Sequence, residues 1–261
     1  MTKHSMKTAA AALLLWCGAI PLAAQTATKA ASAGPVPRTA DGHPDLSGVW
    51  WKGGDVGGRG LALGGRGGTT FASLYQPSAQ TKAKTLADKD DPSLGCVNTA
   101  FGTLNVSMFD VGAVAQIVQT PKFVVVLTET YHSFQIIPFD GRPHRDSVPP
   151  SNRGDAVAHW DGDTLVVDKT NFNDETWISA EGRVSFHSDA LHMVERYTRV
   201  DAKTLEIEAT LDDPKVLTKP WVVPKQTLVL APFDQIMELA CSGAASEALV
   251  DAAAKQSAVK K

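Results

Sequence analysis

The segment 191–211 decides the fold, and it reads LHMVERYTRVDAKTLEIEATL. Apolar and polar residues alternate through 205–211, as they do on a β-strand with one buried face. A short polar loop separates this strand from the one before it, so the segment predicts a hairpin. With 201–203 as the loop, Tyr197 faces Ile207, Met193 faces Leu211, and Arg196 faces Glu208. Apolar side chains then meet across the pair, and opposite charges meet on the other face.

This register places one carboxylate, that of Glu195, on the apolar inner face. A buried carboxylate must be paired, hydrogen-bonded or protonated, which makes it a candidate for a functional site. The alternative is a slip of one residue, which sends His192 and Arg196 inward instead. Either register buries an ionisable side chain.

Strand patterns continue on both sides of this hairpin, and Asp161-Gly162 marks the turn of a second one. One short helix is expected over 77–87. Segments 122–130 and 131–139 are read as two strands or as one bent strand. The remaining expected strands are 46–51, 113–119, 156–160, 164–168, 183–187, 191–200, 205–211, 221–230 and 235–241.

These elements predict an all-β, mainly antiparallel fold, because a parallel sheet needs crossover helices for which the chain has no room. We expect a lipocalin- or calycin-like β-barrel of about ten strands with one short helix. The alternative is a β-sandwich. A barrel of this size can hold one small ligand in its interior.

The N-terminal residues predict export from the cytoplasm. Lys3 and Lys7 precede an apolar stretch that is too short for a bilayer span, and Ala23 and Ala24 offer a cleavage site. We therefore expect a signal peptide over 1–24 and a periplasmic or secreted protein, with an uncleaved anchor as the alternative. A flexible leader over 25–40, a single β domain over 41–241 and a helical or disordered tail over 242–261 complete the expected organisation.

Charge and motifs exclude several classes of partner. Loss of Lys3 and Lys7 with the signal changes the formal net charge from −3 to −5, and no large basic cluster suggests a nucleic-acid surface. The glycines of 53–68 lack the Lys-Ser or Lys-Thr of a phosphate loop. We expect no cofactor, no nucleic acid and no stable membrane span after signal removal, and a small molecule as ligand or substrate.

Two cysteines remain after the signal, Cys96 and Cys241. In an oxidising compartment an isolated pair favours a disulfide. Two separate buried thiols are the alternative.

Candidate site residues follow from strand alternation. If the apolar face of 131–139 is inside, His132 lies inside with it, and His132 and Glu195 become candidates for proton transfer. The expected ligand-binding set is Tyr131, His132, His187, His192, Glu195 and Arg196. No metal site is expected. Joint ligation by His187 and His192 would need a turn at Ser188-Asp189 and at least a third ligand, such as His132 or His144.

Several segments of the chain resemble segments of a group of secreted bacterial proteins of uncharacterised function. The resemblance is carried by PRTADG (37–42), DLSGVW (45–50), DPSLGC (91–96), HSF (132–134), DGRPH (140–144), WDGDTLVV (160–167) and HSDALH (187–192). It spans about residues 37–241, implies one domain and brings no catalytic assignment. The Gly48-Val49-Trp50 tripeptide is also similar to the Gly-x-Trp of lipocalin-type barrels.

Three functions remain open at this point. The first is a secreted protein that binds a small, partly apolar molecule inside a barrel. The second is a cofactor-independent lyase, isomerase or hydrolase that uses His132 and Glu195. The third is a structural envelope protein without a ligand.

Overall fold

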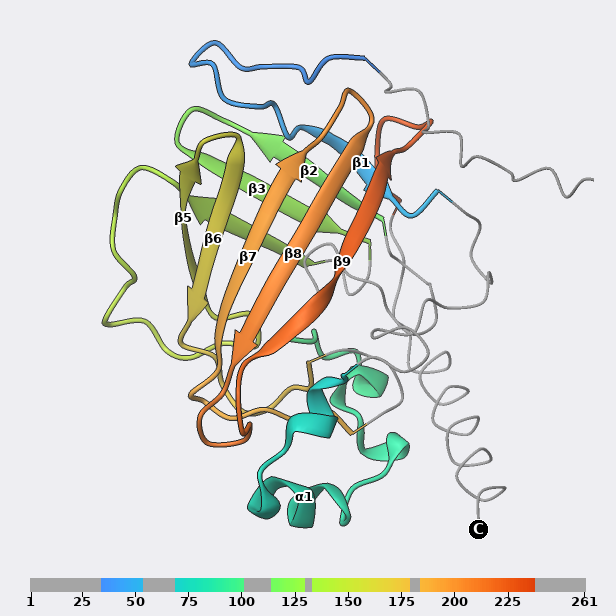
Figure 1. Cartoon of the computed structure of the whole chain (residues 1–261), viewed down its shortest axis with the longest axis vertical. Helices are drawn as coiled ribbons and strands as arrows, with labels where there is room; N and C mark the ends of the chain where they lie inside the picture. The colour runs from blue at the N-terminus through green and yellow to red at the C-terminus, as the bar shows by residue number, and fades with distance from the viewer. Residues whose placement is uncertain (1–33, 54–68, 101–113, 130–132, 179–183, 238–261) are drawn as a thin grey trace, which may run out of the picture. The chain divides into compact units, whose positions relative to one another are not determined.

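Nine antiparallel strands form one sheet in the order β4-β3-β2-β1-β9-β8-β7-β6-β5 (Figure 1). The computed structural model describes residues 34–53, 69–100, 114–129, 133–178 and 184–237. The strands are β1 (Gly48–Trp51), β2 (Ala115–Gln119), β3 (Phe123–Thr128), β4 (Ser133–Pro138), β5 (Asp155–Asp161), β6 (Thr164–Thr170), β7 (His192–Arg199), β8 (Thr204–Asp212) and β9 (Trp221–Leu230).

The sheet curls into a nearly closed barrel, with β7, β8 and β9 on one side and β2 and β3 behind them (Figure 1). Each strand pairs antiparallel with its neighbours, and the two ends of the sheet, β4 and β5, do not pair with each other. The expected all-β antiparallel barrel is therefore confirmed. Among the described strands, the barrel is open at the seam between β4 and β5.

The decisive hairpin has the expected register. Tyr197 pairs with Ile207, Met193 with Leu211, and Glu195 with Ala209. Buried and less buried residues alternate along the whole of β7, which turns Glu195 inward. Because the side-chain period of a strand is two, the same alternation turns His192 and Arg196 to the outer face.

Three expected elements differ from the structure. Segment 184–187 forms no strand; Phe186 makes only an isolated bridge to Trp177. Residues 235–237, the described part of another expected strand, are also irregular. The helix α1 (Pro77–Ala83) ends earlier than expected, because Thr85 and Leu86 donate to carbonyls three residues back, in the tighter pattern of a turn.

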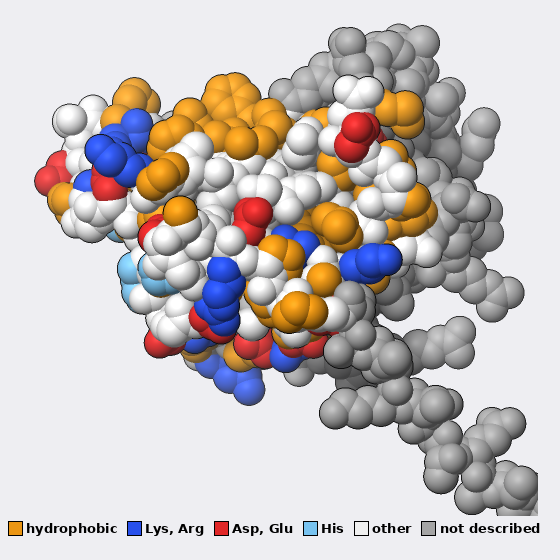
Figure 2. All heavy atoms as spheres, turned by 90° about the horizontal axis from the view of Figure 1, so that it is seen from above, with side chains coloured by type: hydrophobic (Ala, Val, Ile, Leu, Met, Phe, Trp, Pro, Cys, Tyr) orange, Lys and Arg blue, Asp and Glu red, His pale blue; other side chains and the backbone are white. Residues whose placement is uncertain are grey.

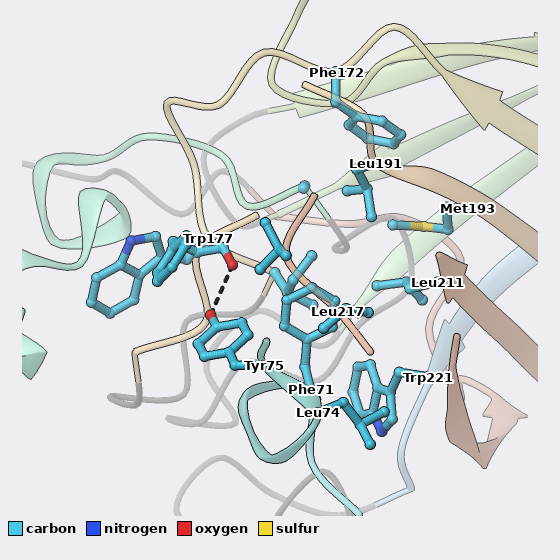
Figure 3. Close-up of a cluster of buried hydrophobic side chains, with 14 of the residues drawn as sticks. Phe71, Leu74, Tyr75, Phe172, Trp177, Leu191, Met193, Leu211, Leu217 and Trp221 are labelled. Carbon is cyan, nitrogen blue, oxygen red and sulfur yellow. Dashed lines mark hydrogen bonds between the residues drawn. The ribbon is translucent and has the colours of Figure 1, made fainter. Parts of the chain in front are cut away.

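Two hydrophobic clusters fill the described interior. One is made by side chains of the strands around Trp50 and Leu205. The other lies where the helical segments η1 (Phe71–Leu74) and α1 pack on the sheet, and includes Phe71, Tyr75 and Met193 (Figure 3). Two further short helical turns, η2 (Asp88–Asp90) and η3 (Pro92–Gly95), follow α1.

Glu195 lies on β7 between the two clusters, since Met193 belongs to one and Tyr197 to the other. Glu195 and Lys169, whose Nζ lies 2.7 Å from Glu195 Oε2, form a polar layer between these clusters. Among the described residues, no helix has the length and hydropathy needed to cross a membrane.

Candidate ligand site at the barrel seam

A cavity of about 420 Å³ lies at the seam between β4 and β5, and we call it the seam pocket. Its apolar wall comes from β3, β4 and the loop after β4, and consists of Phe123, Phe134, Ile136, Pro138 and Pro143. Phe134 is 63% exposed and Ile136 is 55% exposed. Large exposed apolar side chains beside a cavity are typical of a surface that binds a ligand or a partner.

Three arginines line the same cavity: Arg142, Arg145 and Arg153. Arg142 is exposed and pairs with Asp140, with 2.6 Å between Nη2 and Oδ2. Arg145 pairs with Asp155 at 2.6 Å. The charges of these two guanidinium groups are thus balanced by carboxylates of the protein itself.

Arg153 differs from the other two, because it is only 9% exposed and is paired at one corner alone. Its Nη1 donates to Ser133 Oγ, and its backbone carbonyl accepts from Gln135 Nε2 at 3.1 Å. Its Nε and Nη2 are buried and have no hydrogen-bond partner in the described part of the chain. These two N–H groups share one edge of the planar guanidinium, where they point the same way and match the two oxygens of a carboxylate.

The guanidinium of Arg153 also interacts electrostatically with Glu195. Burial lowers the pKa of Arg153, and the negative charge of Glu195 opposes that change. An arginine remains protonated even so, because its ordinary pKa lies far above neutrality. Arg153 therefore keeps a permanent positive charge and two parallel donors, unpaired within the described residues, at a buried position in the lining of the seam pocket.

Glu195 is the centre of a buried cluster. Lys169 Nζ lies 2.7 Å from Glu195 Oε2, and both side chains are at most 2% exposed. Tyr197 donates its hydroxyl to the same oxygen at 2.6 Å. Burial lowers the pKa of Lys169, whereas its attraction to Glu195 raises it. A carboxylate held by an ammonium group and a phenol is better suited to fix its neighbours and balance their charge than to accept a proton.

A second polar cluster lies on the outer face of β5, β6 and β7. His144, in the loop after β4, places Nδ1 at 3.0 Å from Asp155 Oδ2 and Nε2 at 2.8 Å from Asp168 Oδ1. His192 Nε2 lies 2.9 Å from the other oxygen of Asp168. Arg145 completes the cluster through its Nε, which donates to Asp155 Oδ1 at 2.6 Å.

His187, a predicted ligand-binding residue, is buried, and its ring is hydrogen-bonded to other residues of the protein. Its Nδ1 lies 2.9 Å from the carbonyl of Ser188, which can only accept, so Nδ1 carries the proton. Its Nε2 then accepts from Thr176 Oγ1 at 2.8 Å. Burial lowers the pKa of His187, which favours this neutral form. Both ring nitrogens are used within the protein.

The structure does not bring the predicted set together. Glu195 faces inward, whereas Arg196 lies on the outer face and pairs with Asp161 at 2.7 Å. His192 is on that outer face too, so neither can share an interior pocket with Glu195. The physical reason is the period of two along β7, which separates neighbouring side chains onto opposite faces. Tyr131 and His132 lie outside the described residues.

The predictions about the cysteines and about metal binding concern residues that the structure describes only in part. Cys241 lies outside the described residues, so its pairing with Cys96 stays a prediction. Within the part of the chain that the structure describes, no three His, Cys, Asp or Glu side chains are arranged to hold a metal ion.

Arg153 and Lys169 were not predicted from the sequence. Lys169 follows Leu165 and Val167 in the same alternation, and the expected strand ended one residue too early to include it. Arg153 precedes β5 in a loop that has no periodicity, so its burial has no signal in the local sequence.

No family model, no curated protein and no solved structure matches this chain.

Proposed function

We propose that this protein binds a small molecule with a carboxylate group and an apolar body, and that the seam pocket holds it. The observation that carries the proposal is the Nε–Nη2 edge of Arg153, which is buried, aligned as a carboxylate requires and without an acceptor from the described residues. An unpaired buried donor costs about 1–3 kcal/mol, so an anionic acceptor placed there recovers that free energy. Phe134 and Ile136 supply the apolar surface for the rest of the ligand.

Selectivity requires both the apolar wall and the charged donor pair of Arg153. An apolar wall alone would take neutral molecules equally well, whereas a charged donor pair discriminates strongly against a ligand without a matching acceptor. In the view from above, charged side chains of both signs are interspersed, and hydrophobic side chains lie along the upper margin and in patches towards the centre and right (Figure 2).

Matched carboxylate and amide ligands test the proposal. Calorimetric titrations use phenylacetate, 2-naphthoate and octanoate, each against its own amide, at neutral pH and constant ionic strength. We expect at least one carboxylate to bind about tenfold more tightly than its amide, as one charge-assisted hydrogen-bond pair predicts.

Two variants locate the effect. Arg153→Met should abolish the preference for the carboxylate, whereas Arg142→Met, in the same pocket but already paired with Asp140, should preserve it. Equal binding of every acid and its amide by the wild-type protein would refute the proposal. So would a preference that survives in Arg153→Met.

We propose further that the protein acts outside the cytoplasm, on the strength of the signal-like N-terminus. Intact mass spectrometry of the protein from a periplasmic extract tests this. The expected mature chain begins close to residue 25. Its mass should be about 2 Da lower before reduction than after it, because reducing one disulfide adds two hydrogens of about 1 Da each. A full-length chain confined to the cytoplasm would contradict export, and equal masses before and after reduction would contradict the disulfide.

A further inference from the structure

The loop between β4 and β5 forms part of the seam pocket through Arg142, Pro143 and Arg145. His144 belongs to the same run of four residues, and its ring is bonded to β5 and β6 rather than to the pocket. The hydrogen bonds that hold His144 in place therefore also help to hold Arg142, Pro143 and Arg145, which form this wall of the pocket. The bonds that do so connect the loop to Asp155 and Asp168.

Both partners of the His144 ring are carboxylates, and this fixes its required state. Nδ1 lies 3.0 Å from Asp155 and Nε2 lies 2.8 Å from Asp168. An ionised carboxylate can only accept, so each ring nitrogen must donate, and only the imidazolium form has two N–H groups. In the neutral ring one nitrogen lone pair would face a carboxylate oxygen, and that contact would become repulsive.

The surrounding charges support the imidazolium. Asp155 on β5 and Asp168 on β6 face it directly. His192 on β7 contacts the far oxygen of Asp168, and Arg145 contacts Asp155. On β8, Asp212 stands opposite His192 in the register.

The direction of the pKa change of His144 follows from these partners. Partial burial lowers its pKa, but the hydrogen bonds to Asp168 and then to Asp155 outweigh burial and raise that pKa above its ordinary value. The pKa values of both aspartates are lowered in spite of burial, because Asp155 accepts hydrogen bonds first from Arg145 and then from His144, and Asp168 accepts them first from His192 and then from His144.

We propose that His144 is an acid-strengthened clasp on the seam pocket. As imidazolium it joins the pocket wall to β5 and β6. On losing its proton it loosens that wall, which Arg145 still ties to Asp155, and so weakens the hold on an anionic ligand. This inference rests on the proposed function for its effect on binding, although the clasp itself does not. Ligand affinity should thus be higher at mildly acidic pH than at mildly alkaline pH.

Hydrogen exchange of the wild-type protein without any ligand tests the clasp alone. Peptides from 139–154 are followed at about pH 6, 7 and 8, with rates corrected for intrinsic exchange, across the range in which a histidine titrates. Protection of this loop should fall as the pH rises. His144→Gln should remove the pH dependence, whereas His159→Gln, an exposed histidine on β5, should retain it. Protection that does not vary with pH in the wild-type protein overturns the clasp.

Binding of phenylacetate, 2-naphthoate and octanoate at the same pH values tests its consequence. The affinity should fall about fivefold from about pH 6 to 8, within the range of typical coupling between two sites, and should be flat in His144→Gln. Carboxylate binding that is flat in the wild-type protein overturns the clasp and leaves the proposed function intact. If none of the three binds, the proposed function fails, and hydrogen exchange alone decides the clasp.

Discussion

At the scale of single residues, the seam pocket is lined by an arginine, Arg153, that we expect to lower the stability of the barrel. A buried guanidinium with two unpaired donors is costly, and such residues persist where a function needs them. For Arg153→Met we predict a free energy of unfolding equal to that of the wild type or up to about 1 kcal/mol higher. Urea unfolding followed by tryptophan fluorescence measures this. A loss of several kcal/mol would show that the guanidinium is a structural element of the barrel.

The buried Lys169–Glu195 pair should behave in the opposite way. Removing one partner leaves the other charge buried alone, so Lys169→Met or Glu195→Leu should each lower the free energy of unfolding by about 3–5 kcal/mol. The double variant should lose less than the sum of the two single losses, because neither member of the pair is left buried without the other. A double-mutant cycle in urea gives the coupling free energy, and simple additivity would contradict the pairing at 2.7 Å.

Residues on regular strands were predictable, and those on loops were not. Glu195 is inward because the alternation of β7 and β8 admits one register with apolar contacts on one face. The same period, carried one residue further along β6, would have found Lys169. Arg153, His144 and their partners meet only because the loop after β4 folds back onto the barrel, and no local pattern encodes that contact.

At the scale of elements, hairpins were the most predictable units. The Asp161-Gly162 turn and the 201–203 loop join strands whose apolar faces match, so sequence and structure agree there. Segment 184–187 was mistaken for a strand because its side chains alternate. In the structure His187 and Ser188 instead bond to Thr176 and Asp213, which takes this segment out of the sheet.

The start of β5 should be sensitive to a single methyl group. Gly154 has φ +67°, and a Cβ there would lie 2.4 Å from the carbonyl oxygen of Thr170 and 3.0 Å from the ring of Phe172. Gly154→Ala combines a left-handed backbone with a clash, so we expect it to lower the free energy of unfolding by about 3 kcal/mol or more.

Gly162, in the β5–β6 turn, is the matched control for this substitution. Its φ is +60°, and a Cβ there would meet nothing within 4 Å. Gly162→Ala should therefore cost only the backbone strain, about 1 kcal/mol. Thermal and urea unfolding of both variants would reveal the difference, and equal losses would contradict the close approach at Gly154.

At the scale of the whole molecule, the open seam is what distinguishes this barrel from a closed one. Closure would pair β4 with β5 and leave no room for the cavity between them. The two hydrophobic clusters stabilise the barrel on either side of the polar layer. The fold can therefore hold charged residues at the seam without losing its core.

Stability should depend on pH with a sign set by the buried carboxylates. The pKa of Asp155 is lowered in the folded protein, since its bonds from Arg145 and His144 outweigh burial. Its contribution is present above the unfolded value of about 4 and is lost as the pH falls through the lower folded value. We expect the free energy of unfolding to fall between about pH 5 and 3, and to fall less steeply in Asp155→Asn. Urea unfolding at several pH values measures both slopes, and identical slopes would contradict the lowered pKa.

The most direct test of carboxylate binding at the seam observes the guanidinium itself. The side-chain Nε–H signal of Arg153, assigned through its absence in Arg153→Lys, is recorded by ¹H–¹⁵N NMR during addition of phenylacetate, 2-naphthoate or octanoate. A charge-assisted hydrogen bond to Nε should move this proton downfield with at least one acid, and the corresponding amide should leave it unchanged. If one of these acids binds and the Nε–H signal of Arg153 stays in place, the carboxylate is held elsewhere and the seam is not its site.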